Sequence, residues 1–88
     1  MTGAPQRINE LVAELRGLQR TEEGRLREVS TLVTDLEGQL REVEALQTRE
    51  VRRFRDYLLL ELTRLRAEQA YLRAHVESLG TFLGARTP

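Results

Sequence analysis

A basic cluster of four arginines is the one group of residues in this chain whose chemistry suggests a ligand. The cluster comprises Arg49, Arg52, Arg53 and Arg55. Guanidinium groups on a helix can neutralise phosphates, so these arginines are the candidate nucleic-acid contact, with salt-sensitive and non-specific binding. However, Glu44, Glu50 and Asp56 would compete for the guanidinium groups, and no aromatic outside the presumed core is placed for base stacking. We expect a solvated or ion-paired helix face, with nucleic-acid binding as the alternative.

Residues that could support catalysis or bind a metal are scarce. The sequence has no cysteine, one histidine (His75) and two serines, Ser30 and Ser78. A lone imidazole without a second histidine or a cysteine nearby is a poor metal site, so we expect His75 to flank the core or face solvent. Catalysis needs a nucleophile, a base and an electrostatic stabiliser that converge in a pocket. The sequence therefore predicts no enzyme activity, no catalytic or metal site and no cofactor.

The element that carries these residues follows from one apolar stripe. Steps of three or four residues connect its positions almost from end to end, although only 40% of the chain is apolar. Such a stripe is stable only when it is buried against another helix. The predicted oligomer interface therefore comprises Ile8, Leu11, Leu15, Leu18, Leu26, Val29, Val33, Leu36, Leu40, Val43, Gln47, Val51, Phe54, Leu58, Leu62, Leu65, Gln69, Leu72, Val76, Leu79 and Leu83, with Glu22 as a charged interruption.

The stripe predicts an all-α fold, a single long helix that forms an oligomeric coiled coil or helical bundle. We expect a coiled-coil helix over residues 5–83, a flexible N-terminus at 1–4 and a flexible C-terminus at 84–88. The only prolines are Pro5 and Pro88, and Pro5 suits a first helical turn because its missing N–H would be unpaired there. Consecutive steps of four occur at three places and predict stutters that relax the supercoil: Leu18–Glu22–Leu26, Val43–Gln47–Val51 and Phe54–Leu58–Leu62.

The alternative fold is a helical hairpin with a break near Gly24 or Gly38. Each glycine inside a helix costs ~1 kcal/mol relative to alanine, so both positions are candidate turns. Against a break, the stripe passes both glycines without losing phase. We therefore favour one continuous helix.

Charge is divided unevenly along the chain and favours antiparallel pairing. Residues 1–48 carry six arginines and nine acidic residues, whereas residues 49–88 carry eight and five. An antiparallel pair places the acidic half of one helix beside the basic half of another, although each surface pair contributes only ~0–1 kcal/mol. Gln47 opposite Gln69 of a partner would help to fix the register, with a two-fold axis near Leu58.

A secondary apolar patch widens the stripe and suggests more than two helices. It comprises Tyr57, Leu59, Leu60 and Tyr71. A wide apolar face is typical of a helical bundle or of a docking site for another protein. We therefore expect a structural or scaffold protein that self-associates as an antiparallel dimer or tetramer and acts as a spacer or protein–protein adaptor. The alternatives are a nucleic-acid-associated helical protein and an obligate subunit that pairs with a different helical protein.

The remaining composition points to a cytoplasmic protein. The formal net charge is zero, which gives no general attraction to nucleic acid or to an anionic membrane. The sequence shows no signal peptide, and its longest aliphatic run, residues 58–60, is far shorter than the ~20 residues of a membrane span. The absence of cysteine fits a reducing compartment. The use of arginine without lysine suggests a GC-rich, bacterial genome.

Overall fold

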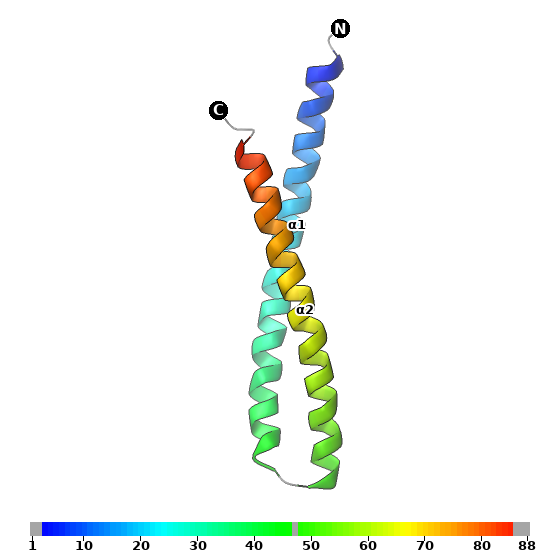
Figure 1. Cartoon of the computed structure of the whole chain (residues 1–88), viewed down its shortest axis with the longest axis vertical. Helices are drawn as coiled ribbons and strands as arrows, with labels where there is room; N and C mark the ends of the chain where they lie inside the picture. Colours follow the sequence, from blue (N-terminus) through cyan, green and yellow to red (C-terminus); the bar gives the residue numbers. More distant parts are fainter. Residues whose placement is uncertain (1–2, 47, 86–88) are drawn as a thin grey trace.

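The computed structural model is an antiparallel helical hairpin. It describes residues 3–46 and 48–85, and for residues 3, 4 and 85 the backbone alone. Helix α1 spans Gly3–Glu44 and helix α2 spans Arg49–Ala85. The two helices lie side by side and cross along their length, with the turn at one end and both ends of the chain at the other (Figure 1). The molecule measures 71 × 20 × 14 Å.

The all-α prediction is confirmed, but the single continuous helix is wrong. The chain reverses between Glu44 and Arg49. Gly24 and Gly38 both lie inside α1, so the hairpin alternative has the right form and the wrong turn. The helices begin at Gly3 and end at Ala85, slightly beyond the expected limits of 5 and 83. The flexibility expected at 1–4 and 84–88 stays a prediction, because residues 1–2 and 86–88 lie outside the described residues.

The turn is formed by a helix cap rather than by a glycine. The Val51 N–H donates to Thr48 Oγ1 over 3.4 Å, and the Arg52 N–H donates to the Thr48 carbonyl over 3.2 Å. Thr48 is therefore the N-cap of α2, where threonine is among the favoured residues. On the other side, the Leu46 N–H donates to the Val43 carbonyl over 3.0 Å. No described residue has a positive φ, so the described part of the turn does not require glycine.

The stripe keeps its phase through the turn because the apolar residues on either side of the turn are spaced like successive positions on one helix. Val43 and Val51 each lie four residues from Gln47, which itself lies outside the described residues. A step of four is also an ordinary helical step. A chain that reverses here and a helix that continues here therefore give the same apolar pattern.

Each helix presents an unbroken coiled-coil repeat to the other, and we call these inner positions the seam. Their spacing alternates strictly between three and four residues, as in a regular coiled coil. All except Arg55 are buried or half-buried. In α1 the seam comprises Val12, Leu15, Gln19, Glu22, Leu26, Val29, Val33, Leu36, Leu40 and Val43, and in α2 it comprises Val51, Arg55, Leu58, Leu62, Leu65, Gln69, Leu72, Val76, Leu79 and Leu83.

The seam corrects the expected stutters. It passes through Gln19 instead of Leu18 and through Arg55 instead of Phe54, so two of the three stutters vanish. The third falls on the turn itself. Leu18 and Phe54 are 41% and 49% exposed, so neither belongs to the interior.

The dry core lies in the middle of the hairpin. Val29, Val33, Leu62, Leu65 and Leu72 are at most 6% exposed and form one cluster. The nine buried apolar residues of the described chain all belong to the predicted stripe. The buried residues are thus only part of the predicted interface, since Ile8 and Leu11 are 47% and 41% exposed, and the helix that covers the buried ones is the other half of the same chain.

Candidate functional site

The hairpin has two broad faces, one on each side of the seam, and contacts between the helices define them. On one face, Arg25 Nε donates to Glu68 Oε1 over 2.8 Å and Nη2 donates to Oε2 over 3.3 Å. On the other face, Arg66 Nη2 lies 3.5 Å from Glu37 Oε2. Residues seven apart in a coiled-coil helix share one side of it. These contacts therefore assign their sequence neighbours to one face or the other.

The face that carries Arg25 and Glu68 is rich in exposed apolar side chains. Multiples of seven residues from these two lead to three leucines of α1 and two phenylalanines of α2, and also to the polar residues Gln39, Glu61 and His75. Tyr71 lies beside them, since the centre of its ring is 5.7 Å from that of His75, which is seven residues from Glu68. The apolar face comprises Leu11, Leu18, Leu32, Phe54, Tyr57, Tyr71 and Phe82, each between 41% and 64% exposed.

The apolar face deepens into a groove at the open end of the hairpin. Here the N-terminal end of α1 extends past the end of α2 (Figure 1). A cavity of about 400 Å³ is lined by Leu11, Leu18 and Phe82, together with Ile8 and Leu15. Residues of both helices thus share one continuous apolar surface.

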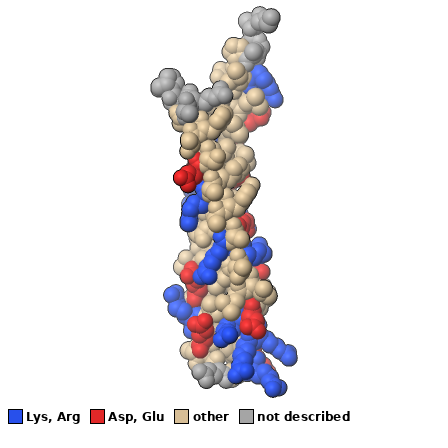
Figure 2. Space-filling model, viewed as in Figure 1, with Lys and Arg blue, Asp and Glu red and all other residues tan. Residues whose placement is uncertain are grey.

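The opposite, polar face carries mostly charged and polar side chains. Multiples of seven from Glu37 and Arg66 lead to Arg16, Glu23, Ser30, Glu44, Arg52, Leu59, Arg73 and Gly80. Gln69 in the seam donates to Ser30 Oγ over 3.0 Å. The Gln19 amide nitrogen lies 3.2 Å from where a Cβ at Gly80 would be, so a side chain at Gly80 would crowd it. Figure 2 shows one broad side of the molecule, with acidic and basic side chains interspersed along it.

Polar residues also interrupt the seam and set its register. His75 Nδ1 lies 2.5 Å from Glu22 Oε2, and the side chains are 35% and 15% exposed. The hydrogen bond from Gln69 to Ser30 holds α1 and α2 at one longitudinal position, since polar pairs in a coiled coil specify register. Gln69 thus pairs within its own chain. The described residues contain no group of three or more His, Cys, Asp or Glu side chains that could hold a metal ion.

The charges of Arg25 and Glu68 are stabilised by each other. The hydrogen bond from Arg25 lowers the pKa of Glu68 below its usual value, and the same bond raises the pKa of Arg25. Arg64 adds a second contact to Glu68 at 3.8 Å. The pair therefore interrupts the leucines of the apolar face without leaving a free charge there.

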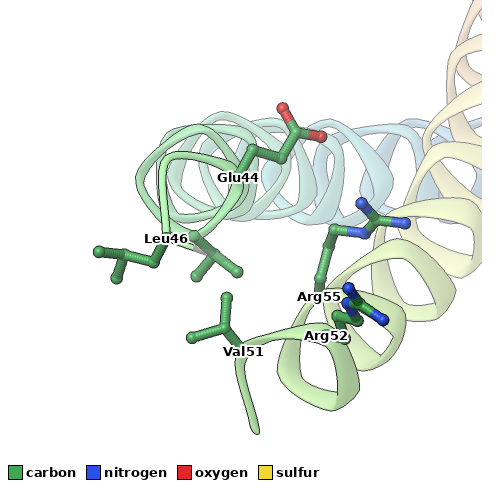
Figure 3. Close-up of a pocket in the computed structure, with 6 residues that line it drawn as sticks. Glu44, Leu46, Val51, Arg52 and Arg55 are labelled. Atoms are coloured by element: carbon green, nitrogen blue, oxygen red, sulfur yellow. The ribbon is translucent and has the colours of Figure 1, made fainter. Parts of the chain in front are cut away.

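The basic cluster lies at the turn end, with all four arginines exposed. No ion pair involves these arginines among the described residues, so the competition expected from neighbouring carboxylates is absent there. Arg52 and Arg55 line a groove of about 310 Å³ beside the turn. In Figure 3, Arg55 extends from α2 toward α1, and Leu46 points away from both arginines. Phe54 is half-exposed, so the expectation that the aromatics near the basic cluster are buried in the core is wrong for this residue.

The secondary apolar patch expected from the sequence is divided by the structure. Tyr57 and Tyr71 lie on the apolar face, Leu59 lies on the polar face, and Leu60, 71% exposed, points outward from α2. Leu32 was not singled out from the sequence. The signal that would have found it is the spacing of Leu11, Leu18 and Leu32 in multiples of seven.

Comparison with known proteins gives no information on function, so the function is inferred from the sequence and the structure. No protein-family model, curated protein or solved structure matches this chain. Over the residues that the structure describes, neither helix has a stretch long and apolar enough to cross a membrane.

Proposed function

We propose that this chain is a non-enzymatic structural protein that self-associates through its apolar face and acts as a spacer or protein–protein adaptor. The observation that carries the proposal is the gathering of seven large apolar side chains, all more than 40% exposed, on one side of the hairpin. Large exposed apolar surfaces mark interaction sites in soluble proteins.

The packing of helices explains why a second copy suits this face. A two-helix hairpin buries only the side chains that point into its seam, and the next positions around each helix stay in contact with water. Two hairpins packed face to face form a four-helix bundle, in which these positions become core. Full burial of a leucine-sized side chain is worth ~1.5–3 kcal/mol, so half-exposed members of the face each retain part of this gain.

The test is a double substitution on the apolar face, Leu18→Glu with Leu32→Glu. Buried carboxylates are costly, so this variant should be monomeric, whereas the wild-type chain forms a dimer. Size-exclusion chromatography with light scattering gives the mass, and circular dichroism confirms that the helices persist.

The matched control is Leu59→Glu with Leu60→Glu, which adds the same charges at exposed positions outside the face. This variant should dimerise like the wild type. A wild-type chain that stays folded and monomeric up to millimolar concentration would contradict the proposal and point to a different helical protein as the partner. Equal loss in both variants would show that the apolar face is not the contact.

A second candidate function is supported by the basic cluster, because its four exposed arginines have no ion pair among the described residues. Four phosphate contacts predict that affinity for nucleic acid falls roughly 100-fold between 50 and 200 mM salt. Fluorescence anisotropy with single- and double-stranded oligonucleotides measures this, and replacing the four arginines by glutamine should abolish it. The control replaces Arg7, Arg16, Arg20 and Arg27 of α1. No binding at 50 mM salt would exclude this function.

A further inference from the structure

We infer that the second copy covering the apolar face is aligned with the first, with both turns at the same end and α1 of each hairpin beside the partner's α2. This inference rests on the proposed function and adds the geometry of the dimer. The side chains that border the apolar face on its two long edges carry it.

The border on α1 consists mostly of hydrogen-bond acceptors. Its residues lie one helical step outside the leucines, and Glu28 shows their position because it accepts a hydrogen bond from Arg25 over 3.1 Å. All are exposed. At intervals of seven residues, the α1 border comprises Arg7, Glu14, Thr21, Glu28, Asp35 and Glu42.

The border on α2 offers hydrogen-bond donors from Tyr57 onward, although the first position of this series is a carboxylate, Glu50. Arg64 lies there because it contacts Glu68 of the apolar face, and Tyr71 lies there because the centre of its ring is 5.7 Å from that of His75. Tyr57 and Ser78 follow at intervals of seven residues. Phenol and guanidinium groups donate hydrogen bonds, and carboxylates accept them. The two edges of the apolar face are therefore chemically complementary.

The two borders also match in position along the molecule. Ser30 lies opposite Gln69 in the hairpin. From this pair, equal steps in opposite directions along α1 and α2 place Glu28 level with Tyr71, Asp35 level with Arg64, and Glu42 level with Tyr57.

In an aligned dimer, a two-fold axis along the hairpin keeps equivalent residues of both copies at the same height. Each of these three carboxylates then meets one donor, namely the partner's Tyr71, the partner's Arg64 or the partner's Tyr57. The chemical match between the edges thus becomes a match between individual side chains.

A reversed copy would bring like against like. It places α1 beside the partner's α1, so the carboxylates of the two α1 borders face one another. It also places two helices of the same net charge side by side. Helix α1 is net negative, with six arginines and nine acidic residues, and α2 is net positive, with seven arginines and five acidic residues. Like charges across an interface disfavour that arrangement and thereby select the orientation, even where single pairs add little affinity.

Distances between spin labels test the orientation directly. The chain has no cysteine, so Ala45→Cys in the turn and Gln6→Cys at the open end each give a single labelling site. Neighbouring helices in a bundle lie ~8–10 Å apart, so two turn labels in an aligned dimer should be within about 30 Å. In a reversed dimer their separation approaches the 71 Å length of the molecule.

Mixed dimers with one label of each kind provide the matched control, because they must give the opposite result. The aligned dimer then yields the long distance and the reversed dimer the short one. A dimer with widely separated turn labels overturns the inference and leaves the proposed function intact. A monomer by light scattering under the same conditions overturns both.

A charge exchange tests the proposed contact between Asp35 and the partner's Arg64. Asp35→Lys should weaken the dimer roughly twofold to thirtyfold, because two such pairs are lost at ~0.2–1 kcal/mol each. The double variant Asp35→Lys with Arg64→Glu restores opposite charges in an aligned dimer and should recover most of the affinity relative to Arg64→Glu alone. Failure of the double variant to recover would contradict this alignment.

Discussion

The polar and apolar faces of the hairpin are built on the same sevenfold spacing but differ in the kind of side chain that they expose to solvent. On the polar face, Glu37 contacts Arg66, and Ser30 accepts a hydrogen bond from the seam. On the apolar face, the pair of Arg25 and Glu68 is surrounded by leucines and aromatic rings that stay in contact with solvent. Opposite charges at the edge of a two-helix seam can reach each other, whereas apolar side chains there need a third helix to cover them.

The largest effect is expected in the seam, because both faces depend on it. Leu62→Ala removes a side chain that is 1% exposed, and leaves a cavity, so it should lower the free energy of unfolding by ~2–5 kcal/mol. Urea denaturation followed by circular dichroism measures the loss. Leu60→Ala, two residues away and 71% exposed, should change it by less than ~0.5 kcal/mol. Equal losses would show that the seam does not run where the structure places it.

The next effect sharpens the difference between the faces. Arg25→Leu with Glu68→Leu adds two leucines per copy to the apolar face. Each buried leucine is worth ~1.5–3 kcal/mol, so the dimer should bind at least about tenfold more tightly. Sedimentation equilibrium gives the dissociation constant. On the polar face, Glu37→Gln with Arg66→Gln should leave that constant nearly unchanged, and a comparable change there would remove the distinction between the faces.

A smaller effect is expected at the turn that keeps the two helices in register. Thr48→Ala removes the N-cap of α2 and should cost ~1 kcal/mol of stability. Thr63→Ala is the control, since Thr63 Oγ1 donates to the Leu59 carbonyl inside a helix and caps nothing. Its removal should have almost no effect or a slightly stabilising one. Thermal unfolding of both variants distinguishes a cap from an ordinary helical threonine.

The smallest effect concerns pH and the charged pair on the apolar face. Because Arg25 lowers the pKa of Glu68 in the folded chain, the stabilisation is complete above the usual glutamate pKa of ~4.3 and is lost as pH falls through the lowered value. Glu68→Gln should therefore reduce the decline of Tm between pH 7 and pH 3. Glu77→Gln, at an exposed position of α2, should keep the wild-type decline. An identical decline in all three proteins would argue against the pair.

Much of the fold could be predicted from the order of residues alone. The helical spacing of Val29, Leu58 and Leu62 identified side chains that are now seen to be buried. The charge difference between residues 1–48 and 49–88 favoured antiparallel pairing, and the division falls where α2 begins. Local propensity and side-chain periodicity are sufficient for these features because they act within one or two helical turns.

The turn and the apolar face were decided by the tertiary structure. Leu18 and Gln19 are adjacent, and hydrophobicity favours Leu18 for the interior, but the strict repeat of the seam places Gln19 there and leaves Leu18 on the apolar face. The chain covers its own stripe because closing a short turn costs little entropy, whereas joining two separate chains costs translational and rotational freedom. An apolar pattern specifies that a stripe must be covered. Which helix covers it depends on that difference in entropy, which the pattern does not contain.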